Sequence, residues 1–209
     1  MSAAHMSDGQ FHATLALGAL IAFFVVIVAS RVLVQARRTG EHGLRFFQMK
    51  IPSVAFFCDL QWVITTVTFC SAVVLAWQGD SLPLTTPPPA PVGAAIAAIG
   101  IALGFGAQLA MGASWRIGLK PGEVTALVER GPFALVRNPI YTCVMVFLVG
   151  LSLLIPTAPM LVGLALAVIG IELQVRVVEE PHLVRVHGAT YRAYAQRVGR
   201  FVPFVGRWS

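Results

Sequence analysis

Charged residues are scarce in this chain. They make up 11% of its 209 residues, whereas 57% of the residues are hydrophobic. Soluble domains usually carry about 25% charged residues, and a soluble fold of this size would have to leave a large apolar patch on its surface. The composition therefore excludes an ordinary soluble domain and predicts a membrane protein that crosses the bilayer several times.

Cysteine is also rare, and a leader sequence is not evident. The three cysteines, Cys58, Cys70 and Cys143, lie inside apolar runs. Because an odd number without metal-ligand spacing fits neither a disulfide framework nor a metal centre, we interpret them as small buried apolar residues and predict no metal site. No positively charged segment precedes the first apolar run, so we expect no signal peptide, and residues 1–11 are expected to form a polar tail.

Apolar runs of membrane-spanning length occur along most of the chain. A transmembrane helix needs roughly 17–25 apolar residues, and the runs 13–34, 54–77 and 91–112 each supply that length. The third run contains Gly100 and Gly104, a small-xxx-small pair that lets a second helix approach closely. We therefore expect three spanning helices in the first half of the chain.

The fourth apolar run, residues 140–171, is too long for one ordinary span and short for two. Pro156 and Pro159 interrupt it, and proline breaks the hydrogen-bond ladder of a helix. We expect a hairpin of two short helices, 140–154 and 159–177, although a single long kinked helix is an alternative. The expected fold is thus all-α, with about five transmembrane helices, the last two forming a short hairpin, followed by cytoplasmic C-terminal helices.

The positive charges predict the orientation in the membrane. All 15 Lys and Arg residues fall within residues 31–50, 113–139 and 172–209, and the connection 78–91 contains none. By the positive-inside rule, the N-terminus lies outside and the C-terminus lies in the cytoplasm, in the inner membrane of the cell. The net charge of +6 is then explained by topology and membrane lipids, so no nucleic-acid partner is expected.

The sequence RGPFALVRNPIY, residues 130–141, stands immediately before the expected hairpin. Gly131 and Pro132 are typical of a turn, and Pro139 suits the first turn of a helix. The segment could contribute to a functional site. Alternatively, Arg130 and Arg137 are ordinary positive-inside anchors and Tyr141 is an interfacial aromatic residue.

Charged residues also follow the hairpin. Glu172, Arg176, Glu179 and Glu180 have helical spacing, and ion pairs are expected between Glu172 and Arg176 and between Arg176 and Glu180. Carboxylates beside apolar helices are costly unless they are paired or used in function. We expect Pro181 to break or restart the helix and His187–Gly188 to end it. Because the hairpin returns the chain, residues 130–141 and 172–203 should be neighbours.

A short amphipathic helix is expected near the end of the chain. Tyr191 and Tyr194 lie three residues apart on one of its faces, and Arg197 and Arg200 follow. Packing against the rest of the protein is the alternative use of such a tyrosine pair.

The order of these motifs resembles a known family. The combination of GPFALVRNPIY, an apolar hairpin, VEEPHL, HGATYRAY and RFVP resembles the isoprenylcysteine carboxyl methyltransferase and phospholipid methyltransferase superfamily of integral membrane enzymes. Its pattern is Arg-His-Pro-x-Tyr, a hairpin, Glu-Glu, and then Gly-x-x-Tyr-x-x-Tyr. The resemblance covers residues 113–203. It implies S-adenosylmethionine as methyl donor and a lipid-like acceptor that is reached from the bilayer.

The resemblance also implies where the ligands bind. It assigns the cofactor pocket to Arg137, Asn138, Pro139, Tyr141, Glu179 and Glu180. Asn138 replaces the usual histidine of the family; it can form hydrogen bonds but cannot titrate near neutral pH, so a binding role remains. We place substrate binding at Tyr191, Tyr194, Arg197 and Arg200. No residue is assigned a catalytic role.

On this resemblance the chain divides into an N-terminal three-helix membrane region, residues 1–112, and a catalytic region, residues 113–209. The predicted function is methyl transfer from S-adenosylmethionine to a lipophilic acceptor at the cytoplasmic membrane face. One alternative is a membrane reductase that uses NADPH on a lipid, but the chain is short and contains no Gly-x-Gly-x-x-Gly. The other is a non-enzymatic lipid-binding scaffold, which has no need of clustered carboxylates.

Overall fold

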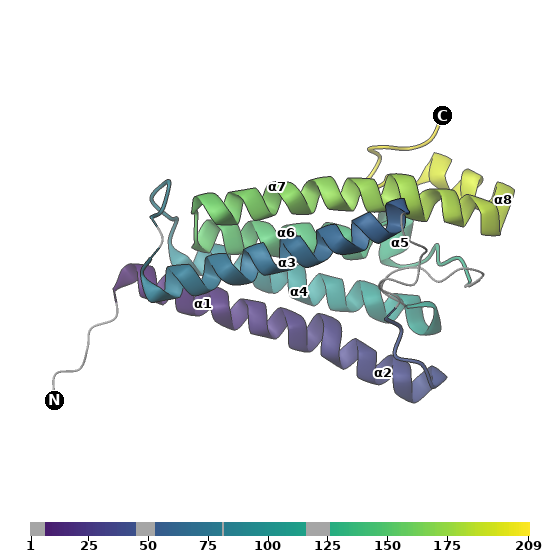
Figure 1. Ribbon diagram of the computed structural model, residues 1–209. Helices are drawn as coiled ribbons and strands as arrows, with labels where there is room; N and C mark the ends of the chain where they lie inside the picture. The colour runs from purple at the N-terminus through teal and green to yellow at the C-terminus, as the bar shows by residue number, and fades with distance from the viewer. Residues whose placement is uncertain (1–6, 45–52, 81, 116–125) are drawn as a thin grey trace.

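The computed structural model describes residues 7–44, 53–80, 82–115 and 126–209 (Figure 1). Helices make up the fold, and none of these residues forms a β-strand longer than an isolated bridge. The expectation of an all-α fold is therefore confirmed.

The first helix is longer than expected at both ends. It consists of α1 (Asp8–Phe23), the π-helical segment η1 (Phe24–Ala29) and α2 (Ser30–Thr39). The expectation of a polar tail through residue 11 is wrong, because Ser7 and Gln10 cap the helix at Asp8. The Ser7 hydroxyl accepts a hydrogen bond from the Gln10 backbone N–H, and the Gln10 side chain accepts one from the Ser7 N–H.

The second and third helices lie where the apolar runs predict them. They are α3 (Val54–Gln78) and α4 (Ala90–Met111), and the short 3₁₀ turn η2 (Gly112–Ser114) follows α4. The most extensive contact between two helices of the described chain joins α4 to α6 (Pro139–Leu154). A Cβ atom at Gly100 would lie 2.6 Å from the backbone nitrogen of Phe147. Glycine at this position therefore permits the close approach that its spacing predicts.

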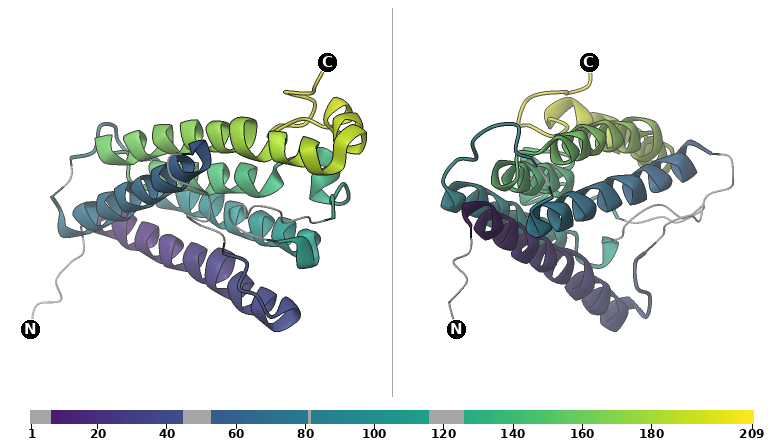
Figure 2. Two further views of the ribbon diagram at one scale, coloured as in Figure 1. Left: turned by 45° about the vertical axis from the view of Figure 1, so that its right-hand side comes forward. Right: turned by 60° about the vertical axis from the view of Figure 1, so that its left-hand side comes forward.

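The chain turns back after α6, as the two prolines predict. The helix ends at Leu154 and α7 (Ala158–Leu173) begins after a turn at residues 155–157, in which the Thr157 N–H donates to the carbonyl oxygen of Ile155. The two helices run side by side in all views (Figures 1 and 2). The alternative of one long kinked helix is thus excluded.

The helix that leaves the hairpin does not break at Pro181. It continues from α7 through the π-helical segment η3 (Gln174–Glu179) into α8 (Glu180–Arg197). Pro181 is the second residue of α8, and it follows the wide turn of η3, in which the regular hydrogen-bond ladder of the α-helix is already interrupted. The chain bends instead at Gly188, whose φ is 55°, where the end of the helix was expected.

Among the described residues, four helical stretches are long and apolar enough to cross a membrane: 8–39, 54–78, 90–111 and 158–197. The 16-residue α6 is shorter, so five crossings remain a prediction. One end of the bundle gathers α2, the end of α4, the short helix α5 (Pro132–Leu135) and α8 (Figures 1 and 2). Most positive residues belong to this end, while Arg45, Lys50, Arg116 and Lys120 lie outside the described residues.

Candidate functional site

The segment that begins α6 pairs with the end of the chain. The Arg137 N–H donates to the carbonyl oxygen of Gly199 at 2.8 Å, and the Asn138 N–H donates to that of Arg200 at 3.1 Å. The Asn138 side chain also donates to the Arg200 carbonyl at 3.2 Å. Residues 130–141 and 172–203 are therefore neighbours, as the hairpin predicts.

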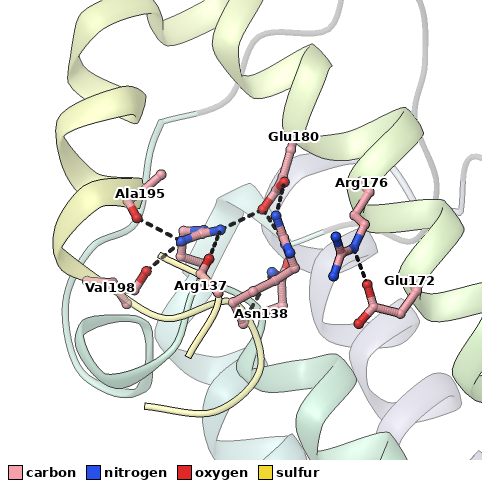
Figure 3. A network of polar contacts seen from close by, with 9 residues as sticks. Arg137, Asn138, Glu172, Arg176, Glu180, Ala195 and Val198 are labelled. Carbon is pink, nitrogen blue, oxygen red and sulfur yellow. Dashed lines mark hydrogen bonds and ion pairs between the residues drawn. The ribbon is translucent and has the colours of Figure 1, made fainter. Parts of the chain in front are cut away.

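Glu180 forms ion pairs with two arginines from different parts of the chain, and Figure 3 shows its contact with Arg137. Arg137 Nη2 is 2.8 Å and Arg200 Nε is 2.9 Å from Glu180 Oε1, while Arg200 Nη2 is 3.0 Å from Oε2. Both carboxylate oxygens thus accept hydrogen bonds from guanidinium groups. The hydrogen bonds from Arg200 to the Glu180 carboxylate raise the pKa of Arg200 above its ordinary value.

Arg137 is also hydrogen-bonded to backbone carbonyls. Its Nη1 donates to Ala195 O at 2.9 Å and to Val198 O, and its Nη2 donates to Gly206 O at 3.1 Å (Figure 3). A buried guanidinium in this position connects the start of α6 with α8 and with the C-terminal residues. The group is therefore a fixed part of the wall of the site.

One expected ion pair is absent. Arg176 pairs with Glu172, as predicted, but Glu180 pairs with Arg137 and Arg200 instead of with Arg176. The expected i,i+4 contact assumes a regular α-helix. The π-helical segment η3 includes Arg176 and ends just before Glu180, and its wider turn changes their relative direction.

Glu179 faces a different set of side chains from its neighbour. Its Oε1 accepts hydrogen bonds from the Tyr141 hydroxyl at 2.5 Å and from Gln174 Nε2 at 3.2 Å. The ring of Tyr141 stacks on that of Trp62 from α3, with centroids 6.1 Å apart. A carboxylate and two aromatic rings therefore lie together where α3, α6 and η3 meet.

The two C-terminal tyrosines are buried. The Tyr194 hydroxyl donates to the carbonyl oxygen of Phe133 at 2.6 Å, which fixes the bent half of α8 against α5. Tyr191 packs edge-to-face on Trp208, with ring centroids 5.9 Å apart. Arg197, in contrast, is exposed and pairs with Glu129 at 3.0 Å.

A cavity of about 600 Å³ extends from this polar region into the bundle. Its size lies within the range of roughly 300–1,000 Å³ that is usual for small-molecule sites. At one end it is lined by polar and aromatic side chains of α3, α6, η3 and α8, and at the other by apolar side chains. The apolar end includes Leu20, Phe23, Ile27, Phe69, Phe147 and Leu148.

The predicted site residues divide into two groups. The cavity is lined by Arg137, Asn138, Pro139, Tyr141, Glu179, Tyr191 and Tyr194. Glu180, Arg197 and Arg200 are not part of its lining. Glu180 and Arg200 nevertheless contact the lining residue Arg137 or its neighbour Asn138, so they position the wall from behind.

Sequence reasoning missed several polar and aromatic lining residues, among them Asp59, Trp62, Gln174 and His182. The sequence could have indicated Asp59, because an ionisable residue inside an apolar run of membrane-spanning length is costly and usually has a function. The indication for His182 was weaker, since it follows Glu179 by three residues and shares its helix face. In the part of the chain that the structure describes, no three His, Cys, Asp or Glu side chains form a metal-binding group.

The described residues thus form an all-helical fold with helices of membrane-spanning length and with a cavity that is polar at one end and apolar at the other. Comparison with known proteins then specifies the class. Residues 90–190 match the model of the phospholipid methyltransferase family. The resemblance predicted from the motifs is therefore confirmed.

The fold matches a solved structure of the eukaryotic intramembrane Ras methyltransferase, isoprenylcysteine carboxyl methyltransferase. The TM-score is 0.59 at 17% sequence identity, over 93% of this chain and 68% of that one. No match is found among curated protein sequences. The family match and this shared fold support a membrane methyltransferase.

Proposed function

We propose that this protein transfers a methyl group from S-adenosylmethionine to a lipophilic acceptor at the cytoplasmic face of the inner membrane. The observation that carries the proposal is the cavity, whose polar and apolar ends are continuous. A polar cofactor from the cytoplasm and an apolar acceptor from the bilayer could meet in it. The placement of positive charge at this end of the bundle favours the cytoplasmic face.

The polar end has groups that suit the cofactor. The Glu179 carboxylate can accept hydrogen bonds from an ammonium group or from ribose hydroxyls. The stacked rings of Trp62 and Tyr141 offer a surface for a cation or an aromatic base. The Oε1 atom of Gln174 is buried and has no hydrogen-bond partner among the described residues. It could therefore accept a hydrogen bond from a bound cofactor.

The apolar end suits a lipid that arrives from the side. Phe24 of the first helix and Val63 and Val67 of α3 line the cavity and are also exposed on the outer surface. The cavity therefore reaches the face of the bundle that lipid would cover. An acceptor with a hydrocarbon chain could enter there without crossing the aqueous phase.

Methyl transfer makes modest demands on the protein. When bound, S-adenosylmethionine supplies an electrophilic methyl group that passes to a nucleophile by in-line displacement. The protein has to align the reactants and exclude water. The Arg137–Glu180–Arg200 network holds the wall in place, and the burial of Tyr191 and Tyr194 limits access of water from the end of the bundle.

We accordingly assign roles to the predicted residues. Arg137, Asn138, Pro139, Tyr141 and Glu179 form the cofactor wall, and Glu180 positions Arg137. Tyr191 and Tyr194 contact the substrate, Arg200 acts through Glu180, and Arg197 lies at the outer rim. The acceptor classes that fit include isoprenyl-cysteine, phospholipid amines, quinones and other lipid nucleophiles.

Calorimetry in nanodiscs tests the proposal. S-adenosylhomocysteine should bind and NADPH should not. Glu179→Gln should weaken binding of S-adenosylhomocysteine about ten- to a hundredfold, because a charge-assisted hydrogen bond contributes roughly 1.5–3 kcal/mol. Glu172→Gln is the matched control, since this carboxylate pairs with Arg176 on the exposed surface. Binding of NADPH would favour a reductase, and binding of neither compound would favour a scaffold.

A further inference from the structure

The chain ends in a tightly built turn that the proposed reaction does not use. This C-terminal turn comprises residues 199–206. The Arg200 N–H donates to Val205 O at 2.8 Å, and the Val205 N–H donates to Val202 O at 3.1 Å. A Cβ atom at Gly199 would lie only 2.1 Å from Val202 O, so the turn closes tightly and requires glycine there.

The turn holds a bulky side chain in an unfavourable conformation. Phe204 has a φ of 68° and is the one non-glycine residue in the described chain with a positive φ. A bulky residue in this region is uncommon and is strained. The strain does not serve packing, because the Phe204 side chain points outward and is 76% exposed.

Two neighbours of Phe204 are presented in the same way. Val202 is 55% exposed and Val205 is 62% exposed. Three outward apolar side chains on one four-residue stretch form a surface that water would not favour. A surface of this kind is stable when lipid covers it.

The turn lies beside the start of a membrane helix. The Thr142 hydroxyl, in the first turn of α6, donates to the carbonyl oxygen of Phe201 at 2.8 Å. The 16 residues of α6 extend only ~24 Å, less than the hydrocarbon thickness of ~30 Å. A helix this short that crosses the bilayer uses its whole length, which would place its first turn near the edge of the hydrocarbon region and residues 201–205 near the lipid headgroups.

The charge of this part of the chain indicates which lipids would meet it. After Glu180 the sequence contains five arginines and no Asp or Glu. One of them, Arg207, is exposed and stacks on the ring of Phe204, with its guanidinium carbon 4.8 Å from the ring centroid. The Phe204 ring with the Arg207 guanidinium stacked on it suits the headgroup region of an anionic leaflet. There the guanidinium can bind lipid phosphate.

We propose that the C-terminal turn is a membrane anchor, which inserts Val202, Phe204 and Val205 among anionic lipid headgroups and places Arg207 on their phosphates. The anchor also supports the site. The carbonyl oxygens of Gly199, Arg200 and Gly206 that hold Arg137 and Asn138 belong to this turn. Lipid contact at the turn therefore stabilises the wall from which these residues project.

Spin labelling of the full chain in nanodiscs tests the insertion. A nitroxide at Val205→Cys should collide more with oxygen, which concentrates in the bilayer, than with a water-soluble nickel complex. A nitroxide at Ala193→Cys, on the exposed face of α8, should show the reverse order. The unsubstituted chain, treated with the same label, gives the background from the native cysteines. Equal nickel contact at both positions would overturn the proposal, and shielding of position 205 from both reagents would indicate a protein contact instead.

Two further variants separate lipid contact from folding. Phe204→Gly removes the ring and relieves the positive φ, so its unfolding temperature in neutral detergent should equal or exceed that of the wild type. In nanodiscs, replacing phosphatidylcholine by phosphatidylglycerol should raise the unfolding temperature of the wild type. The rise should be lost in Phe204→Gly and in Arg207→Gln. A full rise in both variants would overturn the proposal, and none of these measurements depends on methyl transfer.

Discussion

Arg137 Nη2 and Glu180 Oε1 lie 2.8 Å apart, and their side chains are 1% and 5% exposed. The pair joins the segment just before α6 to the first residue of α8, so it connects the segments RNPIY and VEEPHL across the wall of the site. Arg200 adds a second guanidinium to the same carboxylate. Glu180 thus pairs with the buried Arg137 and the partly buried Arg200, and it has little capacity left to bind a ligand.

Glu180→Gln should destabilise the protein by about 3–5 kcal/mol, the cost of removing one partner from a buried ion pair. Glutamine retains a hydrogen-bond acceptor but leaves Arg137 and Arg200 without a counter-charge. The family resemblance assigns Glu180 to the cofactor pocket, and a carboxylate in direct contact with the cofactor would affect binding more than folding when it is replaced by glutamine. Equilibrium unfolding in detergent measures the change, together with the affinity for S-adenosylhomocysteine.

Glu172→Gln serves as the control for this prediction. Its ion pair with Arg176 is exposed, and exposed pairs contribute about 0–1 kcal/mol. Equal losses of stability in the two variants would mean that burial of the Glu180 pair has no energetic consequence. A loss of cofactor affinity in Glu180→Gln at unchanged stability would restore the direct cofactor contact predicted from the motif.

Much of the fold could be predicted because it follows from local rules. The run 54–77 predicts α3 (Val54–Gln78) to within one residue, and the prolines of residues 155–159 predict the turn between α6 and α7. Apolar length and proline act within one segment and need no tertiary information. The sequence RNPIY likewise indicated one wall of the site, because Pro139 begins α6 and directs the residues around it.

The partners across the site could not be predicted in the same way. The contact of Glu180 with Arg200 depends on the bend at Gly188 and on the C-terminal turn, both of which are set by the tertiary fold. The π-helical segment η3 changes the direction of Arg176 relative to Glu180. No local sequence pattern predicted this segment. Asp59 reaches the cavity from a helix that carries none of the family motifs.

Gly150→Ala should destabilise the bundle by about 1–3 kcal/mol, the usual cost of overpacking. A Cβ atom at this position would lie 2.4 Å from the backbone nitrogen of Ala97, so α4 and α6 would have to separate. Gly106→Ala is the matched control in α4, because its Cβ would meet nothing within 4 Å. Thermal unfolding of both variants should show a loss only for Gly150→Ala. Equal effects would mean that close packing of α4 on α6 does not limit stability.

Thr85→Cys should react with a membrane-impermeant thiol reagent on intact cells, and Thr39→Cys should be protected until the cells are opened. Thr85 lies in the connection without positive charge, next to Leu84, whose N–H donates to Pro156 O at the turn of the hairpin. Thr39 ends α2 at the opposite end of the bundle, next to Arg37 and Arg38. The positive-inside rule places that end in the cytoplasm. Labelling of Thr39→Cys alone on intact cells would reverse the orientation.

Val144→Phe should obstruct the cavity between its two ends. Val144 lines the cavity one helical turn beyond Tyr141, so an added ring would extend into the cavity. The affinity for S-adenosylhomocysteine should stay unchanged, because the polar end is untouched. Methyl transfer to a long-chain acceptor should fall by roughly 100-fold, the loss that about 1 Å of misplacement causes. A short-chain analogue of the same acceptor should be less affected.

The control variant is Val149→Phe, which adds the same ring to the exposed side of α6 and should leave turnover unchanged. If Val144→Phe methylates long-chain and short-chain acceptors as well as the wild type does, the acceptor does not occupy the apolar end of this cavity.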